Sequence, residues 1–495
     1  MTDKPAKLED GGLFAAIPRW VFWAFAAALA ALSIVTLIHY PGKWIVYLLF
    51  TVLANALLFF GFRKGAIFFD TFIGGFLWLG FWMKLSVRVA FFGGGFHEAV
   101  GSFGGKGADF DHGLLVASCG FLGLLVASWV REKWLFSYRR EIRFRAHTGV
   151  LEFYRRYRKP VLTLFLLFSL GISISNFVLG IYQRGCITRT ILPFGLSGVY
   201  TWLILFGLSS VSAVVLFCEY SLKKRVPVGV VGISLLDCFF TNLSLLSRAM
   251  ILNGSALLCG LFCLMKGIRD RKGLWSWIRI TVVFGILFIT SVFTVNYVRS
   301  ANLSILLGEE YGHFYEVDVD MSEVRSKTAV LFLDRWVGME GVLAVTGSSE
   351  RGWDLFSRAW REVYAQNLSF YDTYLVNAIY ADIDQTKVRH ISLSGGIAFF
   401  YYPGSLPFLF FSLFVMGLMG GGLEWYFYKF GGGNLILCAL LSQAVAYRFS
   451  HFGYLPSGSY LIFSALILNV LLIALANFVL VRWYSDLKNT PPIRK

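Results

Sequence analysis

The chain has 495 residues, of which 57% are hydrophobic and only 15% are charged, and its formal net charge is +16. So little charge at this length excludes an ordinary soluble protein and predicts a polytopic membrane protein. The apolar runs reach about 20 residues, the length that crosses a hydrocarbon core of about 30 Å. We expect α-helices, because backbone polar groups cannot remain unpaired in lipid.

Twelve apolar runs follow one another along the chain. They are Ile17–Ile38, Trp44–Phe62, Ala66–Phe91, Gly113–Val130, Val161–Tyr182, Tyr200–Cys218, Val228–Leu246, Ala249–Leu264, Ile278–Tyr297, Leu406–Phe427, Asn434–Ala446 and Tyr460–Val481. The first run is too long for a cleaved signal peptide and is expected to remain as the first helix. The predicted fold class is an all-α polytopic membrane protein with about 12 transmembrane helices.

The runs also divide the chain into regions. We expect a cytoplasmic N-terminus at 1–16 and nine transmembrane helices within 17–297. A large, partly helical periplasmic loop or cap would occupy 298–404, in the C-terminal half. Three more helices would lie within 405–482, before a cytoplasmic C-terminus at 483–495.

Lysine and arginine gather in every second loop, and this pattern sets the orientation. Basic residues of these loops include Arg63, Lys64, Lys223, Lys224, Lys266, Arg269 and Lys429. The fourth loop, Arg131–Lys159, mixes arginines with aromatic residues, which suits the surface of an anionic membrane. Because such loops are cytoplasmic, we expect both termini in the cytoplasm. The positive charge belongs to these loops, so no nucleic-acid partner is predicted.

One long hydrophilic segment, Tyr297–Ile391, interrupts the membrane pattern. It carries fourteen acidic and nine basic residues, together with several tryptophans and tyrosines. The spacing of apolar residues in Val324–Val345 predicts an amphipathic helix. Ser349 is expected to cap a second helix that runs to Ala365. We interpret the segment as a folded cap on the outer side of the membrane.

Seven basic residues lie on the side where the orientation rule does not expect them. They are Lys84, Arg88, Arg184, Arg189, Arg248, Arg335 and Arg448. Charged side chains near a membrane are costly and usually face a cavity and a partner, and arginine and lysine suit phosphate. The set therefore predicts an anionic ligand, such as a lipid diphosphate, at the outer leaflet.

Each member of this set also has a simpler interpretation. Lys84 and Arg88 could extend to lipid headgroups. Arg335 could pair with a carboxylate of the cap, and Arg448 could form a helix-end pair with His451.

The remaining candidates lie in the cap. Arg351 and Arg358 could bind the ligand, while Trp336 and Trp353 could stack on sugar rings or belong to an interfacial belt. A sugar hydroxyl that attacks an anomeric carbon needs a base. The candidate bases are Asp334, Glu340, Asp354, His313 and His390. The predicted catalytic group is Arg335, Glu340, Arg448 and His451.

Several motifs are missing from the sequence. A glycine-rich phosphate loop is absent, which argues against an ATPase. The seven cysteines show no spacing for disulfides or metal ligands, and no metal or cofactor is predicted. Acidic residues are scarce within the apolar runs, which argues against an ion-coupled transporter.

The segment LDRWVGMEG, Leu333–Gly341, resembles the Arg-Trp/Phe-x-Gly pattern in the outer loops of Wzy-type oligosaccharide repeat-unit polymerases. The predicted architecture is similar as well, and O-antigen ligases share this plan. The resemblance implies a bacterial inner-membrane glycosyltransferase that makes O-antigen or exopolysaccharide. It would join repeat units carried on undecaprenyl diphosphate, by inverting transfer without a metal. The implied partners are the lipid-linked oligosaccharide, membrane lipid, and a chain-length regulator and flippase of the same pathway.

Three alternatives remain open. An O-antigen ligase is second, because the large loop lacks the histidine cluster of that type. A flippase or exporter of lipid-linked glycan would need basic residues in mid-membrane, whereas here they gather at the outer ends. A structural envelope-assembly protein would tolerate loss of Arg335 and Arg448.

Overall fold

The computed structural model describes residues 19–96, 98–138, 147–247, 250–265, 271–307, 333–363, 369–377 and 391–489. These residues form helices and no β-strand, so the all-α prediction is confirmed for them. The α-helices are α1 (Arg19–His39), α2 (Trp44–Phe60), α3 (Phe68–Leu77), α4 (Lys84–Phe92), α5 (Gly107–Val130), α6 (Thr148–Leu179), α7 (Leu196–Trp202), α8 (Leu208–Lys223), α9 (Val228–Ser244), α10 (Met250–Leu264), α11 (Arg271–Leu307), α13 (Met339–Gly347), α14 (Trp353–Trp360), α15 (Gly396–Phe400), α16 (Leu406–Phe430), α17 (Leu435–Ser450) and α18 (Ser459–Asn489). Among them lie π-helical turns at Trp78–Met83, Arg131–Leu135, Leu203–Gly207 and Asp372–Val376, and a 3₁₀ turn at Pro193–Gly195.

Seven helical stretches of the described chain are long and apolar enough to cross a membrane. They are Phe68–Phe92, Gly107–Leu135, Thr148–Leu179, Pro193–Lys223, Gly273–Arg299, Leu406–Phe430 and Ser459–Tyr484. Shorter apolar helices are Trp23–His39, Trp44–Phe60, Val228–Ser244, Met250–Leu264 and Leu435–Ser450. Helices thus occupy all of the predicted apolar runs, and the number that span the membrane remains a prediction. The helix that contains the fifth predicted run is α6. It begins at Thr148 rather than at Val161, and it has a kink at Tyr157 before Pro160.

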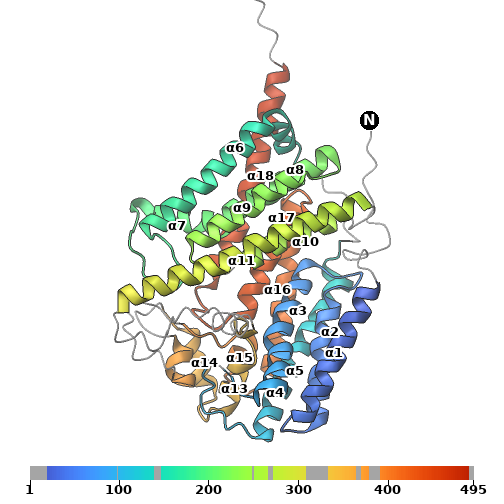
Figure 1. Cartoon of the computed structure of the whole chain (residues 1–495), viewed down its shortest axis with the longest axis vertical. Coiled ribbons are helices and arrows are strands. Elements are labelled where there is room, and N and C mark those ends of the chain that lie inside the picture. Colours follow the sequence, from blue (N-terminus) through green and yellow to red (C-terminus); the bar gives the residue numbers. More distant parts are fainter. Residues whose placement is uncertain are drawn as a thin grey trace, which may run out of the picture.

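The helices form two sets (Figure 1). In one, α16 and α17 pack together and contact α5 and α3, while α2 packs on α5 and α1 on α4. In the other, α9 contacts α6 and α11, and α18 also packs on α6. Close approach within the first set depends on small residues. A Cβ at Gly420 of α16 would lie 2.4 Å from the Phe69 ring.

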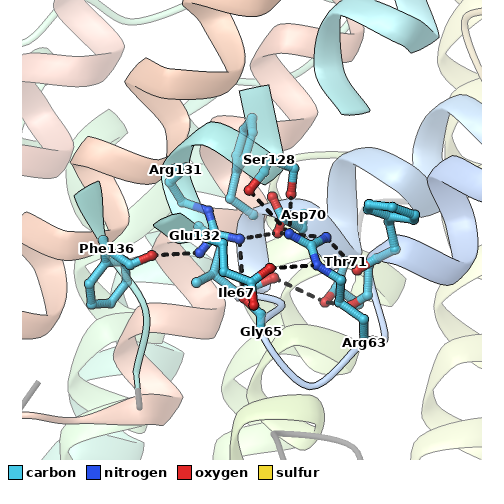
Figure 2. A network of polar contacts seen from close by, with 12 residues as sticks. Arg63, Gly65, Ile67, Asp70, Thr71, Ser128, Arg131, Glu132 and Phe136 are labelled. Atoms are coloured by element: carbon cyan, nitrogen blue, oxygen red, sulfur yellow. Dashed lines mark hydrogen bonds and ion pairs between the residues drawn. The ribbon is translucent and has the colours of Figure 1, made fainter. Parts of the chain in front are cut away.

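A network of buried charges holds the start of the stretch Phe68–Phe92 (Figure 2). Asp70 in the first turn of α3 accepts a hydrogen bond from Arg131 Nη2 at 2.6 Å, and Arg63 Nη1 lies 3.7 Å from the same carboxylate oxygen. Arg63 Nε also donates to Glu132 at 2.9 Å. Carboxylates are favoured at a helix N-terminus, so this arrangement fixes where α3 begins.

The cap lies at the other end of the same stretch. Figure 1 shows α13, α14 and α15 together at the lower end of the molecule, near α4, whereas α18 ends at the top. The predicted continuous helix Val324–Val345 is wrong in its described part, because residues 335–338 are not helical and α13 begins only at Met339. The second cap helix begins at Trp353, later than predicted from Ser349, and ends at Trp360.

Candidate functional site

The segment Arg335–Gly341 packs backbone to backbone against the apolar helical stretch Phe68–Phe92 and against Ser394. A Cβ on Gly338 would lie 1.8 Å from the carbonyl oxygen of Gly80, within the π-helical turn Trp78–Met83. A Cβ on Gly341 would lie 1.9 Å from the carbonyl oxygen of Ser394. Glycine is needed at both positions because two backbones meet there. These close contacts fix the position of the segment that follows Arg335 relative to Gly80 and Ser394.

We expect Gly338→Ala to destabilise the protein by about 3 kcal/mol or more, because the added methyl group would overlap backbone that cannot rotate away. Thermal unfolding of the purified protein in detergent measures the effect. Gly352→Ala is the matched control in the same cap, since a Cβ at Gly352 meets nothing within 4 Å. Equal unfolding temperatures for the two variants would contradict the close packing.

Lys84 and Arg88 do reach the cap, but their charges are matched there. Lys84 Nζ lies 2.7 Å from Glu340 Oε1, and it also donates to the carbonyl oxygens of Asp334 and Trp336 at 3.1 and 2.5 Å. Arg88 forms an ion pair with Asp334, in which its Nε donates to Oδ1 at 3.2 Å. All four side chains are buried. The two bases therefore hold the cap on α4, one turn apart on a shared face.

Arg335 behaves differently from its neighbour Asp334. The Arg335 side chain is half-buried, and it makes no hydrogen bond or ion pair with a described residue. Desolvation lowers the pKa of Arg335 to about 10, with Arg184 and Arg299 acting in the same direction and Tyr447 opposing them. A desolvated guanidinium without a carboxylate partner is unfavourable unless an anion is bound.

Other bases gather around Arg335. The backbone N–H of Arg184 donates to Leu245 at 2.9 Å, and the carbonyl oxygen of Arg184 accepts from Arg299 Nη2 at 2.6 Å. These bonds fix the loop after α6 to the end of α9 and to α11. None of Arg184, Arg335 and Arg448 forms an ion pair with a described carboxylate. We call the group Arg184, Arg299, Arg335, Arg448 and His451 the arginine cluster.

Arg448 and His451 close the cluster from α17. Arg448 lies within the last turn of that helix, and its Nη2 donates to Ser459 Oγ at 2.7 Å and to the carbonyl of Tyr454 at 2.9 Å. His451 follows the helix and stacks on Tyr447 with ring centroids 3.9 Å apart. Burial is the main reason that the pKa of His451 is lowered to about 3; the hydrogen bond to the Tyr447 carbonyl raises this pKa, and the charges of Arg335, Arg184 and Arg448 lower it. The imidazole is neutral at pH 7.

An acidic group lies around Glu340 of the motif. Glu98, from the glycine-rich loop before α5, lies near Glu340, Asp334 and Asp372, with Lys84 as the compensating base. Part of the Glu98 residue is exposed to solvent although protein atoms surround its carboxyl group, whereas Asp334, Glu340 and Asp372 are buried. Desolvation by the surrounding protein and the charge of Glu340 raise the pKa of Glu98 to about 7. The motif Arg335–Gly341 thus has arginines around Arg335 and an acidic group, with Lys84, around Glu340.

We expect the raised pKa of Glu98 to make stability depend on pH. An acid whose pKa rises on folding stabilises the folded state below its unfolded pKa, near 4.3, and this contribution is lost as pH rises through about 7. The unfolding temperature should therefore fall between pH 5 and pH 8. Glu98→Gln should raise the unfolding temperature at pH 8 more than at pH 5. An equal change at both values would contradict the assignment.

The structure places the other predicted residues away from the arginine cluster or in different roles. Trp336 is 4% exposed and stacks on Phe76, which does not suit a sugar platform. Trp353 is 59% exposed and packs edge-on against Phe408, so a sugar or a headgroup can reach it. Arg351 donates to the carbonyl of Ser348 at 3.0 Å.

Arg358 and Arg189 are both exposed. Arg358 pairs with Asp354 at 2.9 Å on the surface of α14, so neither is placed to bind or act as a base inside the cluster. Arg189 donates to the carbonyl of Phe177 at 3.2 Å. Arg248, His313 and His390 lie outside the described residues.

Three residues of the site were missed by sequence reasoning. Arg299 was counted only as part of a long hydrophilic segment, although it ends an apolar run in the way that Arg88 does. Tyr447 is four residues before His451, a spacing that places both on one helix face. Glu98 is the lone acid in the loop GGGFHEAVGSFGGKG, and only the folded chain brings it near Glu340.

The described residues contain no group of three or more histidine, cysteine, aspartate or glutamate side chains that could hold a metal ion. Comparison with protein-family models, with curated proteins and with solved structures gives no match for this chain. Its function is therefore argued from the site itself.

Proposed function

We propose that the protein polymerises undecaprenyl-diphosphate-linked oligosaccharide repeat units at the periplasmic face of a bacterial inner membrane. In this proposal the chain crosses the membrane twelve times, with both termini in the cytoplasm and the cap outside. The observation that carries the proposal is the arginine cluster, in which Arg335 lies half-buried without a described carboxylate partner. The seven long apolar helices support the membrane location.

The arginine cluster suits a diphosphate better than a carboxylate or a neutral sugar. Guanidinium groups offer paired donors that match phosphate oxygens. Neither the Arg335 side chain nor Arg448 Nη1 makes a hydrogen bond to a described residue. An anion bound between them would relieve the repulsion among Arg184, Arg299 and Arg335.

The reaction in this proposal is a single displacement. The hydroxyl oxygen of the acceptor sugar forms a bond to the anomeric carbon of the donor, on the face opposite the diphosphate. The bond from that carbon to the diphosphate oxygen breaks, and its electron pair leaves with undecaprenyl diphosphate. Arg335 and Arg448 stabilise the charge on the leaving group. Holding two lipid-linked substrates in place supplies much of the rate.

The proton of the acceptor hydroxyl moves to a base in the acidic group around Glu340. We favour Glu98 over Glu340 for this role. Glu340 is 5% exposed and bonded to Lys84, whereas Glu98 is exposed to solvent and can be reached by an acceptor. A pKa near 7 also suits a general base at neutral pH.

A ligase-type transfer to another acceptor is the second candidate, since the same cluster would bind the same donor. The exposed Trp353 and Trp360 of α14 fit either acceptor, because sugar rings stack on such faces. The product distinguishes the two reactions: a polymerase lengthens the lipid-linked glycan, whereas a ligase removes it from the lipid diphosphate.

Purified protein in lipid nanodiscs, supplied with lipid-diphosphate-linked repeat units, tests the proposal. We expect products of two or more repeat units on the lipid, with release of undecaprenyl diphosphate. Liposomes with labelled lipid on one leaflet provide the comparison for a flippase. Transfer of label across the bilayer without longer products would rule the polymerase out.

A further inference from the structure

His451 has an unusual setting for a histidine in a catalytic role. It is 7% exposed, and its Nδ1 lies 2.8 Å from Ser450 Oγ and 3.1 Å from the carbonyl oxygen of Tyr447. The stacked ring of Tyr447 fixes its plane. Its Nε2 makes no hydrogen bond to a described residue. The described contacts to the imidazole are thus the ring of Tyr447 and the two polar partners of Nδ1.

The charges around His451 come from several elements, and the strongest are of one sign. Arg448 lies on its own helix α17, Arg335 on the cap segment, and Arg184 on the loop after α6. Tyr447, also on α17, contributes a ring and a carbonyl oxygen. No described carboxylate forms an ion pair with His451. A proton on this imidazole is therefore opposed by three arginines until an anion enters.

We propose that His451 takes up a proton when a diphosphate binds in the arginine cluster, and so becomes an additional cationic ligand of the bound state. This inference rests on the proposed function, because it assigns a role at the same site. It makes His451 a binding residue within the catalytic group that the sequence predicted. Release of the diphosphate would return the proton to solvent and restore the repulsion.

Coulomb's law gives the size of the pKa change that a bound diphosphate can cause in His451. At an effective dielectric constant of about 20, one negative charge about 4 Å away raises a histidine pKa by about three pH units. A diphosphate diester carries two such charges, so it can move a pKa of about 3 to the neutral range. Binding should then strengthen as pH falls through the pKa of the bound state.

One other group titrates in the same range and must be separated from His451. Glu98 has a pKa of about 7 and belongs to the acidic group around Glu340, with Lys84 nearby. Arginines do not titrate between pH 6 and pH 8. A diphosphate that is esterified at both ends has no ionisation near neutrality, so a ligand of this kind contributes no protons itself.

The test is calorimetric titration of the full-length protein in nanodiscs with a farnesyl diphosphate ester of a hexosamine. Two buffers at pH 7 with different heats of ionisation report net proton uptake directly. We expect uptake of a substantial fraction of one proton, and binding at least about threefold tighter at pH 6 than at pH 8. His451→Gln should bind without uptake, and Glu98→Gln should retain it.

Each outcome of the titration either supports or contradicts proton uptake by His451. Binding without proton uptake, or uptake that persists in His451→Gln, overturns this inference and leaves the proposed function standing. Uptake that disappears in Glu98→Gln alone assigns the proton to Glu98 and also overturns it. No binding of the diphosphate ester to the wild-type protein overturns both. If His451→Gln fails to fold, uptake by the wild type and by Glu98→Gln still decides.

Discussion

Replacing Arg335 by alanine is expected to reduce the rate of chain extension by about 10²–10³-fold, the usual cost of losing one preorganised donor to developing negative charge. The same variant should unfold at the wild-type temperature or slightly above it. Arg335 makes no hydrogen bond or ion pair to a described residue, and desolvation disfavours its charge. Initial rates of repeat-unit incorporation in nanodiscs, together with thermal unfolding, measure both quantities.

The combination of unchanged stability and lost activity separates a binding residue from a structural one. Arg361→Ala is the matched control, because Arg361 is an exposed arginine of the same cap; its rate should stay within about twofold of the wild type, as surface substitutions usually have small effects. Arg335→Lys should recover part of the rate, since lysine keeps the charge but loses the paired donors. Wild-type chain extension by Arg335→Ala would contradict the assignment of the donor site.

Lys84→Met should destabilise the protein by about 3–5 kcal/mol, because it leaves Glu340 buried without its partner. It also removes the hydrogen bonds from Lys84 Nζ to the carbonyl oxygens of Asp334 and Trp336. Here stability and activity should fall together, since the ion pair holds the cap on α4. Thermal or denaturant unfolding in detergent, followed by tryptophan fluorescence, gives the measurement.

A double-mutant cycle gives this prediction its control. Lys84→Met with Glu340→Leu removes both charges at nearly constant volume, and should recover more than half of the lost stability. Arg155→Ala breaks the exposed pair with Glu152, whose side chains are 65% and 43% exposed, and should cost less than about 0.5 kcal/mol. Additive effects of the two buried substitutions would show that the charges do not stabilise each other.

Buried ion pairs therefore hold both ends of the stretch Phe68–Phe92, but they join it to different parts of the protein. At its start, Asp70 and Arg131 join membrane helices to one another. At its end, Lys84 and Arg88 join a membrane helix to the cap. Because Lys84 and Arg88 are neutralised by Glu340 and Asp334, the candidate ligand-binding bases are Arg335 and Arg448, which form no ion pair with a described carboxylate.

The helical architecture could be read from the sequence because lipid imposes it locally. Each apolar run must satisfy its own backbone hydrogen bonds, and all of the predicted runs coincide with helices. Boundaries were less accurate where polar residues continue a helix, as at Thr148, because length and hydropathy do not report where a helix leaves the membrane.

The sequence also identified candidate anion-binding residues, because charge is costly at the positions they occupy. These residues are Lys84, Arg88, Arg184, Arg335 and Arg448. The sequence could not decide which of them are paired. Asp334 and Arg335 are adjacent in the chain, yet Asp334 binds Arg88 while Arg335 joins Arg184 and His451. The two ion pairs of the cap join residues that are 256 and 246 positions apart. Only the tertiary structure therefore distinguishes the bases that hold the cap from those proposed to bind an anion.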